Sequence, residues 1–421
     1  HRIKQKHQKP QGNIVDYFIK FHIMIFPVFT LVMPQKRWYN INMTKTIVFG
    51  GSFDPVHVEH INILKAAVSE LSADKVIVVP TKNPPHKSAS RTPFSDRAEM
   101  ARIAFSSVPA EVVVDDIEDK NDGVNYSSEN LPRLEKKYGK FVYVIGGDSL
   151  LALESWHEPE FIVRNFDIAV FDREGYQSAK DKAEELNEKW DGKIRVLNYV
   201  GKEIDSHTIR DRLLLKADVS GLDEKVERYI KERNLYSEFF PYVDKAATYL
   251  DAKRFVHSKN TALVALSLNR NFCPKIDEDK VLLAGLLHDV GKMYDKTEMP
   301  ENIKAAIPKD SIGTPVQHQF VSAEIVRNDF HILDEDILNA IRFHTTGREN
   351  MSKFEKLIYV SDLISYERNF QGVESLRKAV YNDFEKGFIT CLTYSRDYVV
   401  ETGRAVYPLT DKAINFYKEN L

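Results

Sequence analysis

The chain has 421 residues, which is too long for one ordinary domain and predicts two or three. Its composition, 43% hydrophobic and 29% charged, is typical of a soluble globular protein. A net charge of −3 gives no broad basic field, so nucleic acid is not an expected partner. Cys273 and Cys391 are too few for a disulfide framework, a thiolate zinc site or an iron–sulfur cluster, and we expect a cytoplasmic protein.

The start of the chain needs separate treatment. Residues 14–33 are mostly apolar and long enough to span a bilayer. Each charge at mid-bilayer costs roughly 2.5–3.5 kcal/mol, and this stretch is interrupted by Asp16, Lys20 and His22. We therefore expect residues 1–42 to be a non-native or disordered leader ahead of Met43, and no membrane partner. A membrane-associating arm is the alternative.

In residues 45–237, short β-rich runs alternate with amphipathic helical patterns such as 60–71 and 97–108. Several runs are almost continuously apolar, as expected for parallel strands covered on both faces. The predicted strands are residues 46–50, 75–80, 111–116, 141–147, 167–172 and 193–199. This alternation predicts an α/β open parallel sheet, with ligands at the carboxyl ends of the strands.

Beyond Pro241 the patterns become helical, for example over residues 281–292 and 354–364. We therefore predict one domain at 43–237 and an all-α domain at 242–421.

The sequence GGSFDPVHVEH at residues 50–60 follows the first predicted strand. Gly50 and Gly51 allow a sharp turn and close approach to a ligand. His57 and His60 are three residues apart and share one face at the start of a helix, where free N–H groups favour anions. The pattern predicts a site for nucleotide phosphates.

This motif resembles the signature of the H-x-G-H nucleotidylyltransferases, whose fold is Rossmann-like. Glu59 stands where the family has glycine. The family's second motif, ISSTxIR, is similar to IDSHTIR at residues 204–210, with Asp205 and His207 in place of Ser and Thr. The resemblance implies that Arg210 contacts the triphosphate, and that the ATP site includes Gly51, Ser52, Phe53, Ile204 and Ser206.

Three further segments resemble nicotinate-nucleotide adenylyltransferases: PTKNPPHK (80–87), DKNDGVNYSSENL (119–131) and YVIGGDSLLALESWHE (143–158). The resemblance implies that Trp156 stacks on the pyridine ring and that Ser127 holds its carboxylate. It also implies roles for Lys87 and Tyr126 at the nicotinate nucleotide, and for Gly146, Asp148 and Arg173 at the adenosine of ATP.

The implied reaction joins nicotinate mononucleotide and ATP, giving deamido-NAD and pyrophosphate. His57, His60 and Arg210 would be catalytic, with Mg²⁺ on the phosphates. Transfer to another phosphate acceptor, such as phosphopantetheine, is the alternative, against which the Trp156 and Tyr126 segments argue.

A second constellation lies after residue 250. His and Asp are good ligands for divalent first-row metals, and six such residues fall in helical patterns: His257, His288, Asp289, His318, His344 and Asp362. Six ligands, with a carboxylate able to bridge, suit two metals. We expect a helical bundle to bring them together.

HDVGK, FHTTG and DLISYER together resemble bacterial HD-domain hydrolases that split diadenosine tetraphosphate symmetrically to ADP. Gln319 stands where that family usually has glycine. The resemblance implies hydrolysis of dinucleoside polyphosphates with two metals, iron by resemblance, with Asp289 catalytic and Lys292 at a phosphate. Manganese, cobalt or zinc also fit the ligands. A nucleotide-binding regulatory module, or hydrolysis of another nucleotide, is the alternative.

Overall fold

The computed structural model describes residues 46–82, 91–120, 123–173, 179–202, 204–295 and 297–419. The expected leader and the alternative membrane arm lie outside these residues. Within the part of the chain that is described, none of the helices combines the length and apolar character needed to cross a bilayer.

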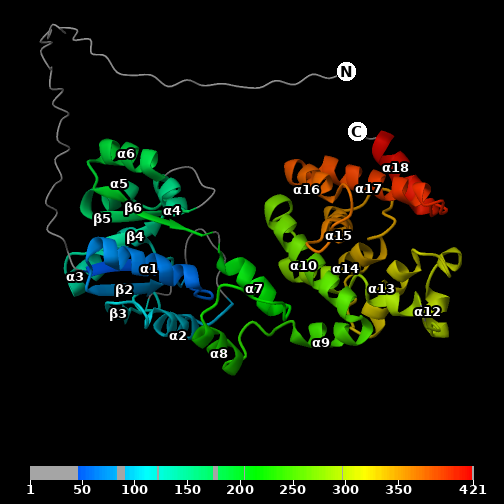
Figure 1. The fold of residues 1–421 in the computed structure, drawn as a ribbon, viewed down its shortest axis with the longest axis horizontal. Coiled ribbons are helices and arrows are strands. Elements are labelled where there is room, and N and C mark those ends of the chain that lie inside the picture. Colours follow the sequence, from blue (N-terminus) through cyan, green and yellow to red (C-terminus); the bar gives the residue numbers. More distant parts are fainter. Residues whose placement is uncertain are drawn as a thin grey trace, which may run out of the picture. The chain divides into compact units, whose positions relative to one another are not determined.

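The N-terminal half is built on a six-stranded sheet in which every neighbouring pair is parallel. The strands are β1 (Thr46–Gly51), β2 (Lys75–Pro80), β3 (Glu111–Val114), β4 (Val142–Gly146), β5 (Asp167–Arg173) and β6 (Ile194–Gly201), in the order β3-β2-β1-β4-β5-β6. All six were predicted, and the α/β fold class is confirmed (Figure 1).

Helices cover both faces of this sheet, because side chains alternate along each strand. Ile47 and Phe49 belong to a core with α1 (Val58–Leu71), α2 (Phe94–Phe105) and α8 (Glu224–Glu232). Val48 belongs to a second core on the opposite face. That core is covered by α3 (Ser127–Tyr138), α4 (Gly147–Leu151), η1 (Leu153–Ser155), α5 (Pro159–Asn165) and α6 (Ala179–Trp190).

The chain passes from β1 to β2 on one side and β4 lies on the other side of β1. This is the topological switch point, where open parallel sheets bind ligands beyond the strands' carboxyl ends. The glycine pairs of β1 and of the β4–α4 junction lie there. After β6, the helix α7 (Ser206–Leu214) carries the second predicted motif.

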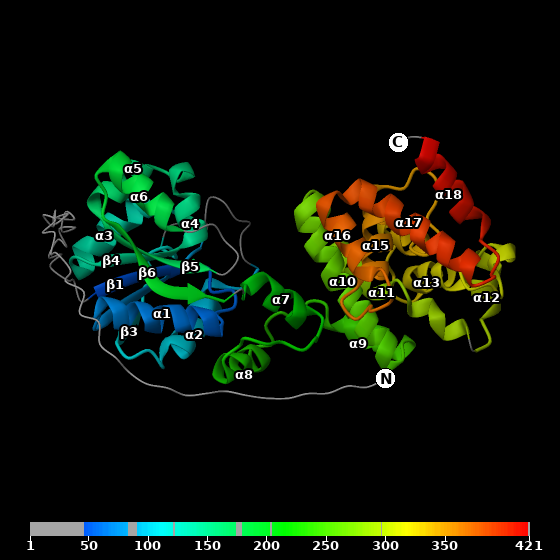
Figure 2. The same cartoon turned by 45° about the horizontal axis from the view of Figure 1, so that its top comes forward.

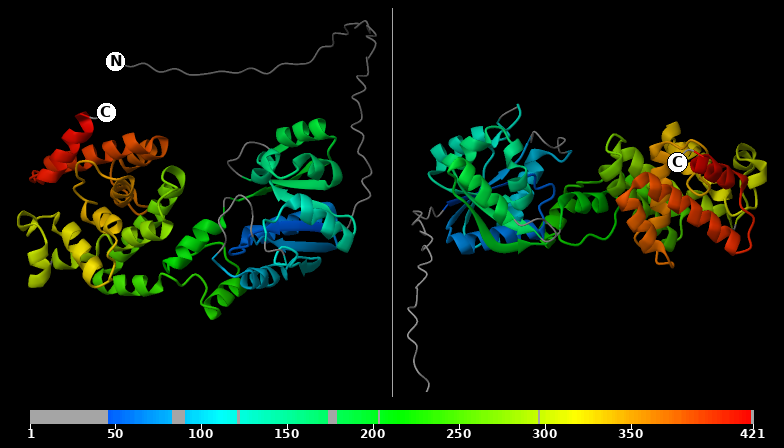
Figure 3. Two further views of the ribbon diagram at one scale, coloured as in Figure 1. Left: turned by 180° about the vertical axis from the view of Figure 1, so that it is seen from behind. Right: turned by 90° about the horizontal axis from the view of Figure 1, so that it is seen from above.

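Residues 240–419 contain helices and no strand among those described (Figure 3). They form α9 (Phe240–Tyr249), α10 (Ala252–Phe272), α11 (Glu278–Leu287), η2 (Val290–Asp295), α12 (Glu301–Ala306), η3 (Lys309–Ser311), α13 (Gln317–Asn328), α14 (Glu335–Arg342), α15 (Lys353–Ile364), α16 (Val373–Asn382), α17 (Phe384–Glu401) and α18 (Pro408–Glu419). Helix α15 lies centrally, packed against α10, α11, α14, α16 and α17 (Figure 2). The predicted all-helical region is confirmed.

One helical prediction differs in detail. The pattern at 281–292 predicted continuous helix, but α11 ends at Leu287 and η2 begins at Val290. A Cβ on Gly291 would lie 2.5 Å from the His318 carbonyl oxygen, so only glycine permits this close packing of η2 on α13. The break places His288 and Asp289 at a helix end.

Candidate active sites

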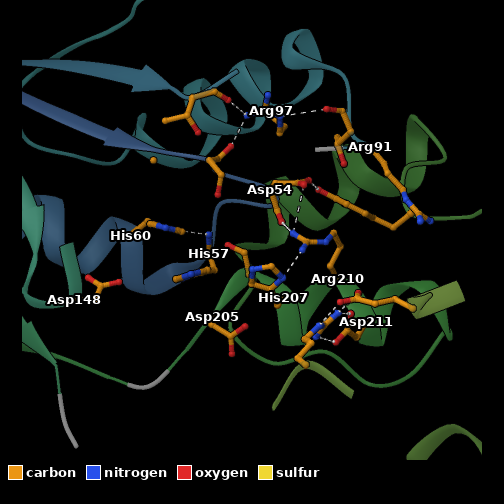
Figure 4. A pocket seen from close by; sticks show the side chains of 18 of the residues that line it. Asp54, His57, His60, Arg91, Arg97, Asp148, Asp205, His207, Arg210 and Asp211 are labelled. Atoms are coloured by element: carbon orange, nitrogen blue, oxygen red, sulfur yellow. Dashed lines mark hydrogen bonds and ion pairs between the residues drawn. The ribbon is translucent and has the colours of Figure 1, made fainter. Parts of the chain in front are cut away.

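The first site begins where β1 turns into α1. His57 is the N-cap of α1 and is buried, and His60 follows on the first turn. Their ring centroids are 3.7 Å apart. The His57 backbone N–H donates to Nδ1 of His60 at 3.2 Å (Figure 4). Because Nδ1 accepts, a neutral His60 carries its proton on Nε2 and can donate it to an anion.

Glycines bring the backbone close to this site. A Cβ on Gly146 would lie 2.3 Å from Oδ1 of Asp148, so a larger residue would displace that carboxylate. One cavity beside the switch point is lined by several of the predicted residues: Gly51, Ser52, His57, His60, Gly146, Asp148, Trp156, Ser206 and Arg210. The structure therefore brings residues from β1, α1, β4 and α7 to one place.

Helix α7 is tied to the turn after β1. Arg210 donates through Nη1 to the Asp54 carbonyl, and Ser206 Oγ donates to the Pro55 carbonyl at 2.9 Å. Arg210 Nη2 also donates to Nδ1 of His207 at 2.7 Å. Desolvation and the adjacent guanidinium lower the pKa of His207, so this imidazole is a neutral acceptor. Figure 4 shows the side chains of Asp54, His207 and Arg210 directed toward one another.

The two departures in IDSHTIR have structural explanations. Asp205 is the N-cap of α7 and accepts from the Thr208 N–H at 2.8 Å, as a serine or threonine would. His207 orients Arg210. The changed residues therefore keep α7 capped and its arginine held beside the cavity.

The residues expected at the pyridine ring lie on the β4 side. Trp156 is half-buried and lines the cavity, while Tyr126 stacks on His157 with centroids 4.4 Å apart. Ser127 hydrogen-bonds the buried Tyr143, which also lines the cavity. Ser127 is the first residue of α3, whose N–H groups favour a carboxylate.

Four other predicted residues have different placements. The Phe53 ring is fully buried and packs edge-on against His60, so it supports the histidine from behind the cavity. Ile204 follows β6 and donates its N–H to the Lys202 carbonyl. Arg173 ends β5 and is described by its main chain alone. Lys87 lies outside the described residues.

Two residues at this site were missed by sequence reasoning. Arg97 is buried and donates to the carbonyls of Ser52 and Thr81, both at 2.7 Å, which joins the loops after β1 and β2. Tyr236 donates to Oδ1 of the buried Asp54 at 2.7 Å, from 182 residues away. No local pattern could have signalled either long-range contact.

The second site is the cluster of six predicted metal ligands in the helical half. Asp289 is fully buried at its centre. Its Oδ1 lies 3.6 Å from His318 Nε2 and 3.5 Å from His344 Nε2. Its Oδ2 lies 3.7 Å from His288 Nε2 and 4.0 Å from His257 Nε2. Asp362 completes the second group, with Oδ1 2.8 Å from His257 Nε2.

The orientation of each imidazole is fixed from outside the cluster. Nδ1 lies 2.7 Å from the Gly285 carbonyl in His288, 2.8 Å from that of Pro315 in His318, and 2.7 Å from that of Ile341 in His344. Nδ1 of His257 is hydrogen-bonded to Glu367. Every Nε2 therefore faces inward, as in metal sites whose outer partners set the tautomer.

The polar atoms of this cluster fit divalent metal ions. Oδ1 of Asp289 and Nε2 of His288 and His344 have no hydrogen bond of normal geometry within the described residues, although all are buried. Such atoms cost free energy unless a ligand satisfies them. Burial lowers the pKa of His288 to about 4, so the ring is neutral and can coordinate a metal.

Three more residues border the cluster. Lys292 lies 2.8 Å from Oδ2 of Asp289, so it pairs with the central carboxylate, and its role at a substrate phosphate stays a prediction. Arg368 pairs with Asp362 at 2.6 Å, and Glu367 supports His257. Both roles were missed at the sequence level. The Glu367 contact depends on α10 packing beside α15, whereas Arg368 and Asp362 lie within the same DLISYER segment.

Gln319 is also explained by its contacts. Its fully buried side chain accepts from the N–H groups of Thr345 and Thr346, each at 3.1 Å. Its Nε2 donates to Oγ1 of Thr346 at 3.0 Å. The side chain therefore holds the HTTG turn that carries His344. His344 itself lies just beyond α14, so it and the His288–Asp289 pair occupy helix ends, which differs from the expected helical positions.

The fold and the two sites define a nucleotidyltransferase-type α/β domain followed by an HD-type metal domain. A family model described as cytidylyltransferase-like matches residues 48–212, and one described as HD domain matches residues 254–367.

Some relatives match one half of the chain, and others match most of its length. A probable nicotinate-nucleotide adenylyltransferase/Ap4A hydrolase of Mycoplasma genitalium is 27% identical over 84% of this chain and 99% of its own length. A probable nicotinate-nucleotide adenylyltransferase of Lachnoclostridium phytofermentans is 32% identical over 46% of this chain and 100% of its own. A symmetrical bis(5'-nucleosyl)-tetraphosphatase of Halalkalibacterium halodurans is 34% identical over 38% of this chain and 87% of its own. The chain belongs to the nicotinate-nucleotide adenylyltransferase family in its N-terminal half and to the symmetrical bis(5'-nucleosyl)-tetraphosphatase family in its C-terminal half.

Proposed function

We propose that the chain is a bifunctional enzyme. Its N-terminal half transfers an adenylyl group from ATP to nicotinate mononucleotide, giving deamido-NAD and pyrophosphate. Its C-terminal half hydrolyses dinucleoside polyphosphates, with diadenosine tetraphosphate giving two ADP. We place the two activities in residues 43–237 and 242–421, in a cytoplasmic protein.

For adenylyl transfer, a phosphate oxygen of the mononucleotide attacks the α-phosphorus of ATP, and the bond to the departing pyrophosphate breaks. No protein nucleophile is required, so catalysis consists of positioning and charge stabilisation. The pairing of His57 and His60 at the switch point carries this proposal. His60 Nε2 donates to the triphosphate, Arg210 offsets its charge, and Mg²⁺ accompanies ATP.

The mononucleotide is assigned to the β4 side of the cavity. Trp156 offers an aromatic face for the pyridine ring, and Ser127 with the first N–H groups of α3 suits its carboxylate. Asp148, at the start of α4, is assigned to the adenosine of ATP. These roles follow from the family resemblance, and of the three residues Trp156 and Asp148 also line the cavity.

For hydrolysis, the central position of Asp289 carries the proposal, because its two oxygens face two different groups of histidines. His257, His288 and Asp362 would hold one divalent ion and His318 and His344 the other. Two such ions supply Lewis-acid stabilisation of phosphoryl oxygens and activation of water. We propose iron, and the ligands also suit manganese, cobalt or zinc. We assign Lys292, at the edge of the cluster, to a substrate phosphate.

One experiment tests both halves. Purified full-length protein is incubated with nicotinate mononucleotide, ATP and Mg²⁺, and separately with diadenosine tetraphosphate and Fe²⁺ or Mn²⁺, and the products are identified. Deamido-NAD and ADP are expected. Metal-free protein without phosphohydrolase activity would instead indicate a nucleotide-binding regulatory module. Transfer to phosphopantetheine but not to nicotinate mononucleotide would contradict the first assignment.

A further inference from the structure

Glu59 occupies the glycine position of the H-x-G-H motif, between two histidines that line the cavity. Its side chain is 1% exposed and does not line that cavity. Because residues 57 and 59 lie on nearly opposite faces of α1, the carboxylate is directed away from the phosphates. A buried carboxylate in this place requires partners of its own.

Those partners lie at the end of β6. Oε1 of Glu59 accepts from Oη of Tyr199 at 2.7 Å and from the backbone N–H of Lys202 at 3.1 Å. Hydrogen bonds to an ionised acceptor are stronger than those between neutral groups. Burial and the adjacent carboxylate raise the pKa of Tyr199 to about 12, so its hydroxyl remains a donor. Glu59 thus joins the first turn of α1 to the end of β6, just before α7.

Lys202 begins the segment that carries the triphosphate residues. Its carbonyl accepts from the Ile204 N–H at 2.9 Å, and the N-cap of α7 is one residue further on. Ser206 and Arg210 then donate hydrogen bonds to carbonyls of the turn after β1. The start of α1 and the turn before it are therefore held to the 202–210 segment by two sets of contacts. Glu59 makes the first set, and α7 makes the second.

We propose that Glu59 is a positioning residue for adenylyl transfer, which anchors the start of the 202–210 segment and thereby places Ser206 and Arg210 against the triphosphate of ATP. This inference rests on the proposed adenylyl transfer. The related motif has a glycine at this position, which has no side chain. In this protein the side chain at this position therefore has a role that a glycine cannot have.

The chain offers a matched control. Glu70, near the other end of α1, accepts from the backbone N–H of Asn198 at 2.9 Å and from its side-chain amide at 3.1 Å. This contact also joins α1 to β6, but it does not involve the segment leading to α7. Loss of Glu70 therefore measures the effect of weakening α1–β6 packing in general.

The test compares Glu59→Ala, Glu59→Gln and Glu70→Ala in the full chain. Glu59→Ala is expected to raise the KM for ATP about tenfold, the scale of a lost charge-assisted contact, with the KM for nicotinate mononucleotide unchanged. Glu59→Gln keeps the shape and one neutral acceptor, so about threefold is expected. Glu70→Ala is expected to leave both KM values unchanged.

Equal rises in both KM values, or the same rise in Glu70→Ala, would show a merely structural role and overturn the proposal. If Glu59→Ala does not fold, Glu59→Gln decides, and an unchanged KM for ATP overturns it. The Kd of MgATP is measured in parallel by calorimetry. A wild-type protein that binds MgATP but forms no deamido-NAD contradicts the proposed function, whereas a wild-type Kd in both Glu59 variants contradicts the role of Glu59.

Discussion

The cavity at the carboxyl ends of β1 and β4 and the His–Asp cluster in the helical half use histidine in different ways. In the first, His60 and Arg210 are hydrogen-bonded to the protein and half-exposed to the cavity. In the second, Asp289, His288 and His344 are fully buried, with atoms left unsatisfied. The first site can therefore exist before its ligand binds, whereas the second is complete only with metal. Substitutions should affect the two activities separately.

The largest effect is expected for Asp289→Ala. It removes the carboxylate that faces both groups of histidines, so metal stabilisation worth several kcal/mol is lost. Hydrolysis of diadenosine tetraphosphate should fall about a thousandfold or more, with loss of bound metal by elemental analysis. Adenylyl transfer by the same preparation serves as the control and should not change. If the Asp289→Ala variant keeps its bound metal and its hydrolytic activity, the proposed difference between the two sites is wrong.

The reciprocal change is His60→Ala. It removes a donor placed for the triphosphate, and loss of one such transition-state donor costs about a hundredfold or more in turnover. The measurement is the kcat for deamido-NAD formation, with hydrolysis of diadenosine tetraphosphate as the control for folding. An unchanged kcat would contradict the catalytic assignment of this histidine.

The strands show what sequence alone could predict. Parallel strands are buried on both faces, so their apolar runs are visible locally, and all six lie where expected. The third is shorter than predicted because Asp115 turns the chain, accepting from the Ile117 N–H. The motifs that contain the predicted ligands are also short stretches of sequence, so they too can be recognised without the structure. The catalytic and binding roles of these residues stay predictions, although the six predicted metal ligands do lie together.

What the sequence could not predict depends on contacts between distant segments. Tyr236 reaches Asp54, Glu367 reaches His257, and Glu59 reaches the end of β6. Each pair is separated by more than a hundred residues, so the motif that holds one partner does not reveal which distant residue it contacts. The same reason explains Gly291, whose need for a small residue arises from α13 packed against it.

An intermediate effect is expected for Glu367→Gln. The carboxylate supports Nδ1 of His257, and loss of such an outer partner typically weakens metal binding about 10–100-fold. Metal affinity is measured by competition with a chelator. Glu385→Gln is the matched control, because this exposed carboxylate pairs with Lys356 rather than with a histidine of the cluster. Equal affinities in the two variants would show that His257 needs no outer support.

The smallest effect concerns Gln319, which holds the HTTG turn much as Glu59 holds the segment before α7. Gln319→Ala leaves the N–H groups of Thr345 and Thr346 without their acceptor, at a cost of about 1–3 kcal/mol. Amide hydrogen exchange at these two residues should accelerate at least about fivefold, with a smaller fall in hydrolysis. Gln317→Ala is the control, because Gln317 accepts from Gly313 and not from this turn. Unchanged exchange in Gln319→Ala would mean that the turn is held by its own backbone, and the parallel between the two sites would fail.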